Sequence, residues 1–186
     1  MKEQEGHEID SFNDFNLVKS LIFKLKEFKK KIFISNVSAI VFDFDGVLTN
    51  NKVYVSERGE ETVRCDKADG HTFELLKKLG LKIFILSSEK NHVVKMRAKK
   101  LNIDLIYGSE NKKNDLQKLC KKNSLDLKKL VYVGNDINDL EAMKISGFSI
   151  AVADAVKEIK NVADYVLDSK GGDMVVREIF NNLIER

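Results

Sequence analysis

Proline and tryptophan are absent from this sequence, and cysteine occurs only twice, as Cys65 and Cys120. Neither cysteine has a second cysteine or a histidine at the spacing of a metal site, so a zinc site and a disulfide framework are both excluded. We therefore expect two reduced thiols in a cytoplasmic protein. Without proline, the turns depend on glycine, asparagine, aspartate and serine.

Long hydrophobic runs are missing as well. The apolar runs, such as Ile83–Leu86, are far shorter than the roughly 18 residues that a membrane helix needs. The polar residues 1–10 contain no apolar stretch of the kind that signal peptides have. The sequence therefore predicts a soluble chain that has no membrane partner.

A strong excess of one charge is also lacking, because 32 lysines and arginines face 29 acidic residues and the formal charge is only +3. The basic residues are spread along the chain, so composition does not indicate a nucleic-acid partner. The length of 186 residues and the hydrophobic fraction of 43% are typical of about one globular domain. Small anionic substrates remain compatible with this balance of charge.

Short β-branched or aromatic runs alternate with longer segments of helical period. The expected strands are Ala39–Phe42, Lys82–Leu86, Leu105–Tyr107, Leu130–Val133, Phe148–Val152 and Tyr165–Leu167. The expected helices are Asp69–Leu79, His92–Leu101, Lys112–Asn123, Asp139–Ser146, Ala155–Val162 and Asp173–Ile184. This alternation predicts an α/β fold of three layers, Rossmann-like, in which right-handed crossovers place helices on both faces of a parallel sheet.

Two segments interrupt the alternation. Lys52–Val55 and Glu60–Arg64 flank a turn-forming stretch, which predicts a β-hairpin directly after the first strand. In Phe15–Lys31, apolar residues share one helical face and lysines line the rest, a pattern that favours a packed surface helix over a membrane-binding one. We therefore divide the chain into an N-terminal extension, 1–36, and a domain, 37–186.

Reactive side chains in doubly wound sheets gather beyond the carboxyl ends of the strands. The first expected strand is followed by Asp43, Asp45 and Gly46. Two carboxylates two positions apart repel each other unless a cation lies between them. The pair therefore indicates a cation-binding or catalytic site, although aspartates that cap a turn would give the same pattern.

The next strand ends add hydroxyl groups, a lysine and further oxygen ligands. Ser87 and Ser88 precede Glu89 at a helix start, where hydroxyl and backbone N–H groups bind phosphate oxygens or simply cap the helix. Lys112 opens the following helix and is either a phosphate-binding residue or a solvated lysine. Residues 134–139 are rich in the oxygen ligands that Mg²⁺ prefers. This succession of acid, hydroxyl, lysine and acid indicates a phosphate-handling site.

These four motifs, in this order and at strand ends between Ala39 and Ile150, resemble those of the haloacid dehalogenase superfamily of phosphohydrolases. The resemblance implies that Asp43 is the nucleophile and that Asp45 is the general acid and base. It also implies that Ser87 and Lys112 hold the phosphoryl group. Hydrolysis through an aspartyl-phosphate replaces one difficult step by two easier ones.

The cofactor that the resemblance implies is Mg²⁺. Its ligands are expected from Asp43, Asp45, Asn135 and Asp136. Asn135 stands where several relatives have a metal-binding aspartate, so the direct ligand is either its amide oxygen or Asp136. Because the amide carries no charge, we expect Mg²⁺ to bind more weakly than in those relatives.

Members of this superfamily usually carry an inserted cap domain. Here the hairpin and one helix fill the stretch from Asp43 to Ser87, and one helix and one strand fill that from Lys112 to Asp136, so no cap fits. The chain resembles the capless subgroup of sugar-acid phosphatases, which act on 3-deoxy-octulosonate 8-phosphate or on nonulosonate 9-phosphates. Because the tetramers of that subgroup place the hairpin and a Gly-Gly segment at neighbouring active sites, a homotetramer is expected, with residues 171–172 as that segment.

Within the subgroup, Glu89 resembles the nonulosonate branch, since the octulosonate branch usually has arginine there. Arg97 and Lys100 match substrate-recognition positions of the same branch, and their spacing of three places both cations on one helix face. There they would bind a sugar-acid carboxylate or orient Glu89, unless they belong to an ordinary charged surface. Asp69 resembles an aspartate of the branch and is either a pocket residue or an N-cap.

The expected function is thus Mg²⁺-dependent hydrolysis of a nonulosonic acid 9-phosphate in the biosynthesis of sugars like sialic acid. A phosphatase for 3-deoxy-octulosonate 8-phosphate is one alternative. Residues 6–15 also resemble the C-terminal end of acylneuraminate cytidylyltransferases, some of which carry a degenerate domain of this type. A non-catalytic oligomerisation domain of such an enzyme is therefore the second alternative.

Overall fold

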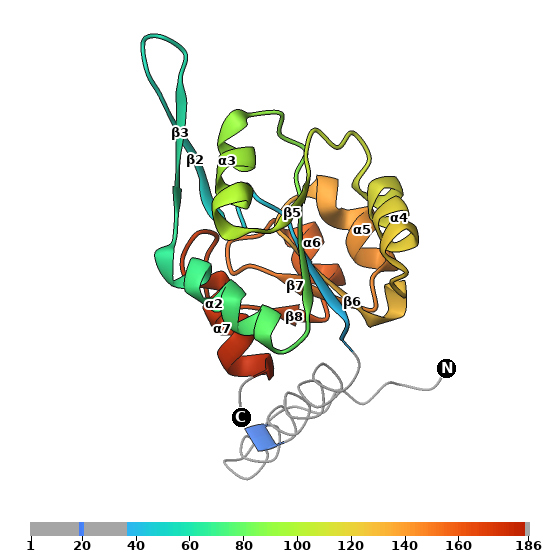
Figure 1. The fold of residues 1–186 in the computed structure, drawn as a ribbon. Coiled ribbons are helices and arrows are strands. Elements are labelled where there is room, and N and C mark those ends of the chain that lie inside the picture. Colours follow the sequence, from blue (N-terminus) through green and yellow to red (C-terminus); the bar gives the residue numbers. More distant parts are fainter. Residues whose placement is uncertain (1–18, 21–36, 185–186) are drawn as a thin grey trace, which may run out of the picture.

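The computed structural model describes residues 19–20 and 37–184 (Figure 1). The described chain forms a parallel sheet of six strands in the order β5-β4-β1-β6-β7-β8. These strands are β1 (Ala39–Phe42), β4 (Lys82–Leu86), β5 (Asp104–Ile106), β6 (Leu130–Gly134), β7 (Phe148–Ala151) and β8 (Tyr165–Val166). The helix expected at Phe15–Lys31 lies outside the described residues apart from Lys19 and Ser20.

Strand β1 lies between β4 and β6, and its four side chains are all apolar and buried. A continuous apolar run is typical of a parallel strand that is covered on both faces. Phe42, at the end of β1, lies opposite Ile85 of β4 and Val133 of β6. The residues that follow these three strands therefore leave the sheet at the same edge.

Helices cover both faces of the sheet (Figure 1). They are α2 (Lys67–Lys78), α3 (His92–Leu101), α4 (Lys112–Asn123), α5 (Leu140–Ile145), α6 (Lys157–Val162) and α7 (Val175–Ile179). Two 3₁₀ turns, η1 (Leu127–Lys129) and η2 (Ile137–Asp139), and a π-helical turn, η3 (Phe180–Ile184), complete the set. Helix α2 packs on α7, whereas α4 packs on α5 and α5 on α6. The predicted three-layer α/β fold is confirmed.

Some element boundaries differ from the predicted ones for local reasons. Helix α2 begins at Lys67 because the side chain of Asp66 accepts a hydrogen bond from the backbone N–H of Ala68 at 2.6 Å. Helix α5 begins only at Leu140, because a capping box between Asp136 and Asp139 closes the preceding 3₁₀ turn. The helix expected to reach residue 184 instead changes from α7 to the π-helical turn η3.

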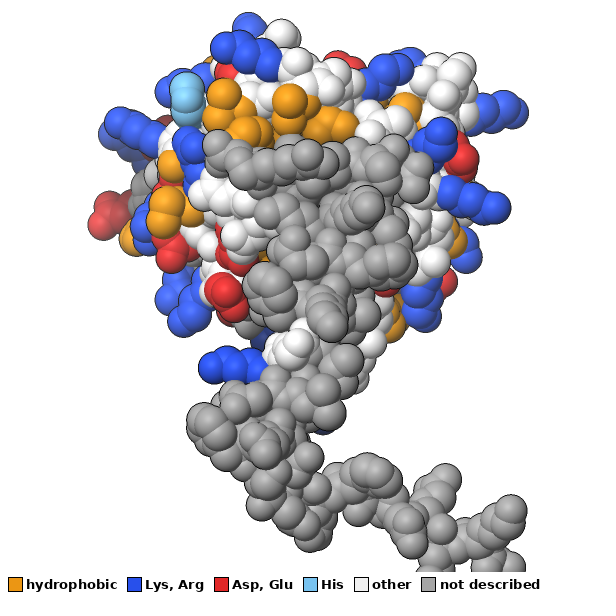
Figure 2. All heavy atoms as spheres, turned by 90° about the horizontal axis from the view of Figure 1, so that it is seen from below, with side chains coloured by type: hydrophobic (Ala, Val, Ile, Leu, Met, Phe, Trp, Pro, Cys, Tyr) orange, Lys and Arg blue, Asp and Glu red, His pale blue; other side chains and the backbone are white. Residues whose placement is uncertain are grey.

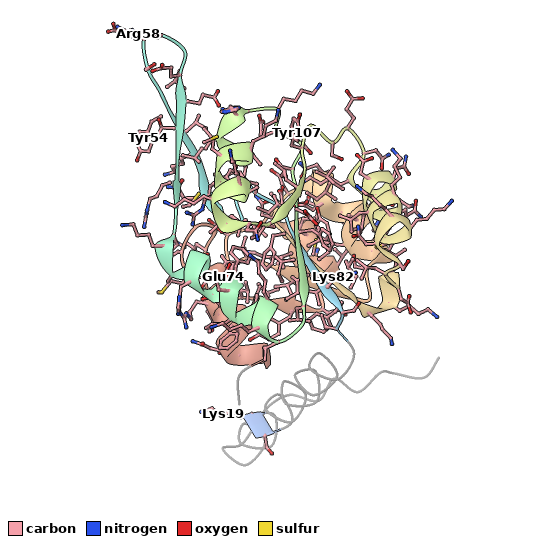
Figure 3. All side chains as sticks on the ribbon, in the orientation of Figure 1. Lys19, Tyr54, Arg58, Glu74, Lys82 and Tyr107 are labelled. Carbon is pink, nitrogen blue, oxygen red and sulfur yellow. The ribbon has the colours of Figure 1, made fainter. Side chains whose placement is uncertain are left out.

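The predicted hairpin is present as β2 (Thr49–Val55) and β3 (Glu61–Cys65), which form a separate antiparallel sheet. It projects from the domain (Figure 1), with Arg58 near its tip and Tyr54 along its length (Figure 3). The side chains of Val53, Tyr54 and Val55 are 54%, 65% and 62% exposed. The hairpin thus presents a cluster of apolar side chains to solvent.

No cap domain is inserted in the part of the chain that the structure describes. Only the hairpin and α2 lie between β1 and β4, and only α4 and η1 lie between β5 and β6. Among the described residues, no helix is long and apolar enough to cross a membrane. Seen from below, basic and acidic side chains are interspersed around the molecule instead of forming one patch of a single sign (Figure 2).

Candidate active site

The carboxyl ends of β1, β4 and β6 enclose a pocket of about 170 Å³. Its lining includes most of the residues that the sequence singles out, namely Asp43, Asp45, Ser87, Ser88, Glu89, Asn135 and Asp136, together with Asn51 and Asn138. The adjacency of the three parallel strands explains why residues so distant in sequence meet here. The pocket is therefore the candidate active site.

Lys112 lies beside this pocket as the first residue of α4, whose N-terminus is capped by Asn111. The Nζ atom of Lys112 lies 2.7 Å from a carboxylate oxygen of Asp43 and 2.7 Å from one of Asp139. The three side chains are only 1%, 6% and 0% exposed, respectively. Lys112 is therefore a buried ammonium shared by two carboxylates, not a solvated surface lysine.

Asp139 is a central residue of the site that the sequence did not single out. In addition to Lys112, its carboxylate accepts hydrogen bonds from the hydroxyl of Tyr132 at 2.8 Å and from the backbone N–H groups of Asn135 at 2.9 Å and Asp136 at 3.3 Å. The sequence included it only as the last residue of the 134–139 loop, which is rich in oxygen ligands for Mg²⁺. The available signal was a second acid, after Asp136, in the loop that follows β6.

The buried cluster of Asp43, Lys112 and Asp139 holds two carboxylates and one ammonium group. Burial raises the pKa of Asp43 well above its ordinary value, the charge of Asp139 raises it further, and Lys112 opposes both. For Lys112, burial acts to lower the pKa, but the two carboxylates outweigh it and raise the pKa above its ordinary value. The cluster therefore retains a charged lysine and favours one additional positive charge nearby.

Asp45 lies at the mouth of the pocket, where its carboxylate accepts a hydrogen bond from the hydroxyl of Thr49 at 3.2 Å. Partial burial raises its pKa, and the negative charges of Glu89 and Glu61 add to this, whereas Thr49 and Lys112 act to lower it. A raised pKa favours the protonated form that a general acid needs. The geometry and the pKa shift of Asp45 thus suit proton transfer.

The side-chain amide of Asn135 faces two oxygen atoms, Oδ2 of Asp43 at 3.2 Å and the backbone carbonyl oxygen of Asp45 at 3.0 Å. In one orientation the amino group donates hydrogen bonds to both, and in the other the amide oxygen joins them as a third oxygen. Adjacent ligands of octahedral Mg²⁺ lie about 2.9 Å apart, because each Mg–O bond is about 2.0–2.1 Å long. The separations of the Asn135 amide oxygen from the other two oxygens, and the chemistry of all three, therefore suit Mg²⁺.

The candidate metal ligands differ in detail from the expected set. Asp45 would contribute its backbone carbonyl oxygen, which leaves its carboxylate available for proton transfer. Asp136 lines the pocket, but its carboxylate accepts the backbone N–H of Ile137 at 2.7 Å. Among the described residues, no group of three or more His, Cys, Asp or Glu side chains is placed to hold a metal ion. A Mg²⁺ ion here would thus be held by Asp43, by the amide oxygen of Asn135 and by a backbone oxygen.

Two glycines allow the close approaches on which the site depends. Gly46 has a φ of +83°, and a Cβ atom there would lie 2.0 Å from the side chain of Asn135. A Cβ atom on Gly134 would lie 2.7 Å from the side chain of Asp139. Both positions therefore require glycine.

The Gly-Gly segment at 171–172 is not a free tail. A Cβ atom on Gly171 would lie 2.1 Å from the carbonyl oxygen of Gly46, and the N–H of Gly172 donates to the carbonyl of Val47 at 2.9 Å. The sequence suggested that this segment reaches the active site of a neighbouring subunit. In the structure it packs against the loop that follows β1 of its own chain.

The loop after β4 presents Ser87, Ser88 and Glu89 to the pocket. The hydroxyl oxygen of Ser87 accepts the backbone N–H of Glu89 at 3.1 Å, and that of Ser88 accepts a hydrogen bond from the amide of Asn138 at 3.2 Å. These bonds link the loop to itself and to η2. Glu89 is exposed at the mouth of the pocket.

Three residues that the sequence associated with substrate lie elsewhere. Asp69 is 2% exposed, and its carboxylate accepts hydrogen bonds from the backbone N–H groups of Val176 at 2.9 Å and Arg177 at 3.1 Å. The structure thus gives Asp69 a capping role for α7 in place of a substrate contact. Arg97 donates to the carbonyl oxygen of Asp66 at 2.8 Å, and Lys100 is exposed near the far end of α3. Neither cation lines the pocket.

Comparisons with known proteins agree with this geometry. The model of the haloacid dehalogenase-like hydrolases matches residues 77–179. The 3-deoxy-D-manno-octulosonate 8-phosphate phosphatase of Escherichia coli K12 is 31% identical over 150 residues, which are 80% of each chain. That of Haemophilus influenzae is 29% identical over 153 residues, which are 82% of this chain and 85% of the relative.

Solved structures give the same result. The 3-deoxy-D-manno-octulosonate 8-phosphate phosphatase of Moraxella catarrhalis, in complex with magnesium ion, phosphate ion and KDO, superposes with a TM-score of 0.80 at 28% identity and covers 87% of this chain and 91% of its own. The cobalt-bound enzyme of Haemophilus influenzae gives a TM-score of 0.78 at 28% identity, with 82% and 90% covered. This chain therefore belongs to the haloacid dehalogenase-like hydrolases, in the branch without a cap domain, and is a phosphoric monoester hydrolase.

Proposed function

We propose that this protein hydrolyses the terminal phosphate of a sugar acid in a Mg²⁺-dependent reaction, and that its substrate is a nonulosonic acid 9-phosphate. The observation that carries the proposal is the buried cluster of Asp43, Lys112 and Asp139 beside the carboxylate of Asp45. A nucleophilic carboxylate, a fixed cation and a proton donor are what phosphoryl transfer through an acyl phosphate requires.

In the first half-reaction, a carboxylate oxygen of Asp43 attacks phosphorus while the bond from phosphorus to the sugar oxygen breaks. Asp45 donates its proton to the departing alkoxide. Lys112 holds Asp43 in place through the 2.7 Å contact and offsets the charge that gathers on the phosphoryl oxygens. Mg²⁺, when bound by Asp43, the Asp45 carbonyl and Asn135, neutralises the repulsion between the two anions that must meet.

In the second half-reaction, water attacks phosphorus and the bond to the Asp43 oxygen breaks, which restores the carboxylate and releases phosphate. Asp45, now deprotonated, accepts the proton of the attacking water. The hydroxyl of Ser87 and the N–H groups of its loop are available to hold the phosphoryl oxygens.

The substrate class is supported by two observations. The relatives quoted above act on 3-deoxy-D-manno-octulosonate 8-phosphate, a sugar acid that carries its phosphate at the end opposite to the carboxylate. Glu89 lines the pocket at the position where the resemblance associates glutamate with nonulosonates and arginine with octulosonates. The octulosonate remains the alternative substrate, because the compared proteins of known activity act on it.

A non-catalytic assembly domain is less well supported. A degenerate domain would be expected to lose parts of the catalytic set, yet the buried lysine, both aspartates and the oxygen cluster are retained. We nevertheless propose that the chain forms a homotetramer through its hairpin, since Val53, Tyr54 and Val55 are exposed there. Sedimentation tests this assembly, and an active monomer at working concentrations contradicts it.

Phosphate release from matched sugar-acid phosphates tests the proposed function. We expect hydrolysis of a nonulosonic acid 9-phosphate at millimolar Mg²⁺, slower hydrolysis of 3-deoxy-octulosonate 8-phosphate, and no release from either after chelation of the metal. Faster hydrolysis of 3-deoxy-octulosonate 8-phosphate would identify the octulosonate ester, and not the nonulosonate ester, as the substrate. The absence of release from every ester at millimolar Mg²⁺ would favour the assembly domain.

A further inference from the structure

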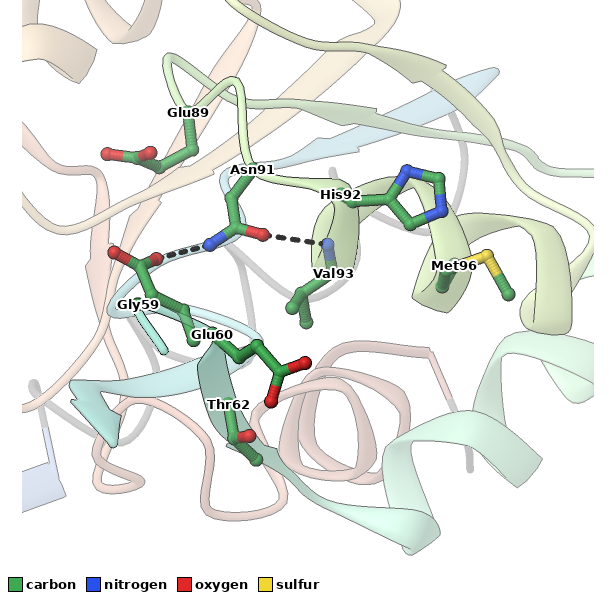
Figure 4. A pocket seen from close by; sticks show the side chains of 9 residues that line it. Gly59, Glu60, Thr62, Glu89, Asn91, His92, Val93 and Met96 are labelled. Atoms are coloured by element: carbon green, nitrogen blue, oxygen red, sulfur yellow. Dashed lines mark hydrogen bonds between the residues drawn. The ribbon is translucent and has the colours of Figure 1, made fainter. Parts of the chain in front are cut away.

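A second cavity, of about 240 Å³, adjoins the candidate active site between the hairpin and the start of α3. It shares Asp45, Asn51 and Glu89 with the pocket that contains Asp43. A wider hollow farther out shares Glu61 and Glu89 with the 240 Å³ cavity (Figure 4). A substrate whose phosphate lies against Asp43 would therefore have room for its leaving group in the 240 Å³ cavity.

The charges around this cavity all have one sign. Three of its lining residues, Asp45, Glu61 and Glu89, are acidic, and the rest are asparagines and apolar residues. Within the described chain, no lysine, arginine or histidine lines it. Lys90 follows Glu89 in the chain, but its Nζ atom lies 3.8 Å from a carboxylate oxygen of Glu110 and does not line the cavity. Because Asp45 enters the reaction in its protonated form, Glu61 and Glu89 are the charges of this lining that an anionic group next to the phosphate would meet, and both repel it.

Glu61 is held in this position by a specific contact. The side-chain amino group of Asn91 donates a hydrogen bond to the carboxylate of Glu61, and the amide oxygen of Asn91 accepts the backbone N–H of Val93 at 3.0 Å (Figure 4). One asparagine thus caps α3 and fixes a hairpin carboxylate in the wall of the cavity. Glu61 retains lone pairs that can accept hydrogen bonds from hydroxyl groups.

We infer that Glu61 is a specificity-determining residue that, together with Glu89, accepts hydrogen bonds from the hydroxyls of the leaving group and excludes leaving groups with a carboxylate close to the phosphate. The inference rests on the proposed phosphatase function. It means that a sugar acid enters with its neutral polyhydroxyl end first and keeps its carboxylate far from Asp43. Short phosphorylated acids are rejected for the same reason, because they cannot separate the two anions.

The test compares glycerol 3-phosphate with 3-phosphoglycerate, which have the same number of carbons but carry a hydroxymethyl group and a carboxylate, respectively. The measured quantity is the ratio of their kcat/KM values or, where hydrolysis is slow, of their inhibition constants against p-nitrophenyl phosphate. We expect the wild type to prefer glycerol 3-phosphate by about tenfold or more, as repulsion of the carboxylate by Glu61 and Glu89 predicts.

The decisive variant is Glu61→Gln, because its amide oxygen still accepts the hydrogen bond from Asn91 while the charge is removed. We expect the ratio of kcat/KM for glycerol 3-phosphate to that for 3-phosphoglycerate to fall by about threefold to tenfold in Glu61→Gln and in Glu89→Gln. This is the effect of removing one charge from a partly solvated site. Glu60→Gln is the matched control, since Glu60 precedes Glu61 but lines only the outer hollow. Its ratio should remain close to that of the wild type.

An unchanged ratio in Glu61→Gln, with p-nitrophenyl phosphate still hydrolysed, overturns the inference and leaves the phosphatase function intact. An equal change in all three variants also overturns it, because it would reveal only the overall charge of the surface. The absence of Mg²⁺-dependent hydrolysis of p-nitrophenyl phosphate by the wild type would instead contradict the proposed function itself, and the inference with it.

Discussion

Replacement of Asp139 by asparagine tests the buried cluster on which the site is built. The carboxylate of Asp139 is fully buried and accepts hydrogen bonds on both of its oxygens. One oxygen faces Lys112 and the hydroxyl of Tyr132, and the other faces the backbone N–H groups of Asn135 and Asp136. Because an amide has only one oxygen, one of these two pairs of donors would face an NH₂ group in the variant.

The size of the effect follows from these contacts. Loss of a hydrogen bond to a charged group costs about 1.5–3 kcal/mol, and a buried donor without an acceptor costs about 1–3 kcal/mol. The removal of one carboxylate also relieves its repulsion with Asp43, which offsets part of the loss. We therefore expect Asp139→Asn to lower the free energy of unfolding by about 2–4 kcal/mol.

Urea unfolding of the metal-free protein measures this change, and phosphate release shows whether Lys112 still supports catalysis. Glu141→Gln is the control, since Glu141 also pairs with lysines, at 2.8 Å and 3.6 Å, but on an exposed surface where solvent screens the charges. Its effect should be much smaller. A loss of less than about 1 kcal/mol in Asp139→Asn would show that the fold does not need the second buried acceptor oxygen.

Three further predictions concern pH, metal affinity and packing. Burial raises the pKa of Asp69 from 3.8 to about 6, so the stability contributed by its protonated form is lost as the pH rises through that range. In urea titrations the wild type should therefore lose stability relative to Asp69→Asn between about pH 4 and 6. Asn135→Asp should lower the Mg²⁺ concentration for half-maximal phosphate release but destabilise the metal-free protein, because it adds a carboxylate next to Asp43. Gly171→Ala should lower both the thermal unfolding temperature and the rate of phosphate release, because its Cβ atom would lie 2.1 Å from the backbone oxygen of Gly46. The control Gly80→Ala, with nothing within 4 Å, should show only the cost of a positive φ, about 1 kcal/mol.

Much of the fold follows from local pattern. The apolar run of β1 and the amphipathic helix α3 have the bounds that their residue patterns predict, because burial on both faces or on one face leaves a clear period in the sequence. The elements that differ are short or irregular. The 3₁₀ turn before α5 depends on the capping box of Asp136 and Asp139, and the π-helical turn after α7 left no signal in its composition.

The site could be predicted where its residues directly follow strands. Asp43, Ser87 and Asn135 meet because parallel strands end at one edge of the sheet. The role of Asp139 could not be predicted, because it depends on a lysine 27 positions away and on the fold that joins them. Likewise, nothing in the sequence showed that the carboxylate of Asp69 would cap a helix more than 100 residues later.

The role of Asp43 as the nucleophile is measured by the rate of phosphate release by the wild type and by Asp43→Asn at the same saturating Mg²⁺ concentration. We expect the variant to release no phosphate although it remains folded, since the amide cannot attack phosphorus but its oxygen can still accept a hydrogen bond from Lys112, which Asp139 continues to pair. Circular dichroism and thermal unfolding without Mg²⁺ establish that it is folded. A folded Asp43→Asn variant with the turnover of the wild type would show that Asp43 is not the nucleophile.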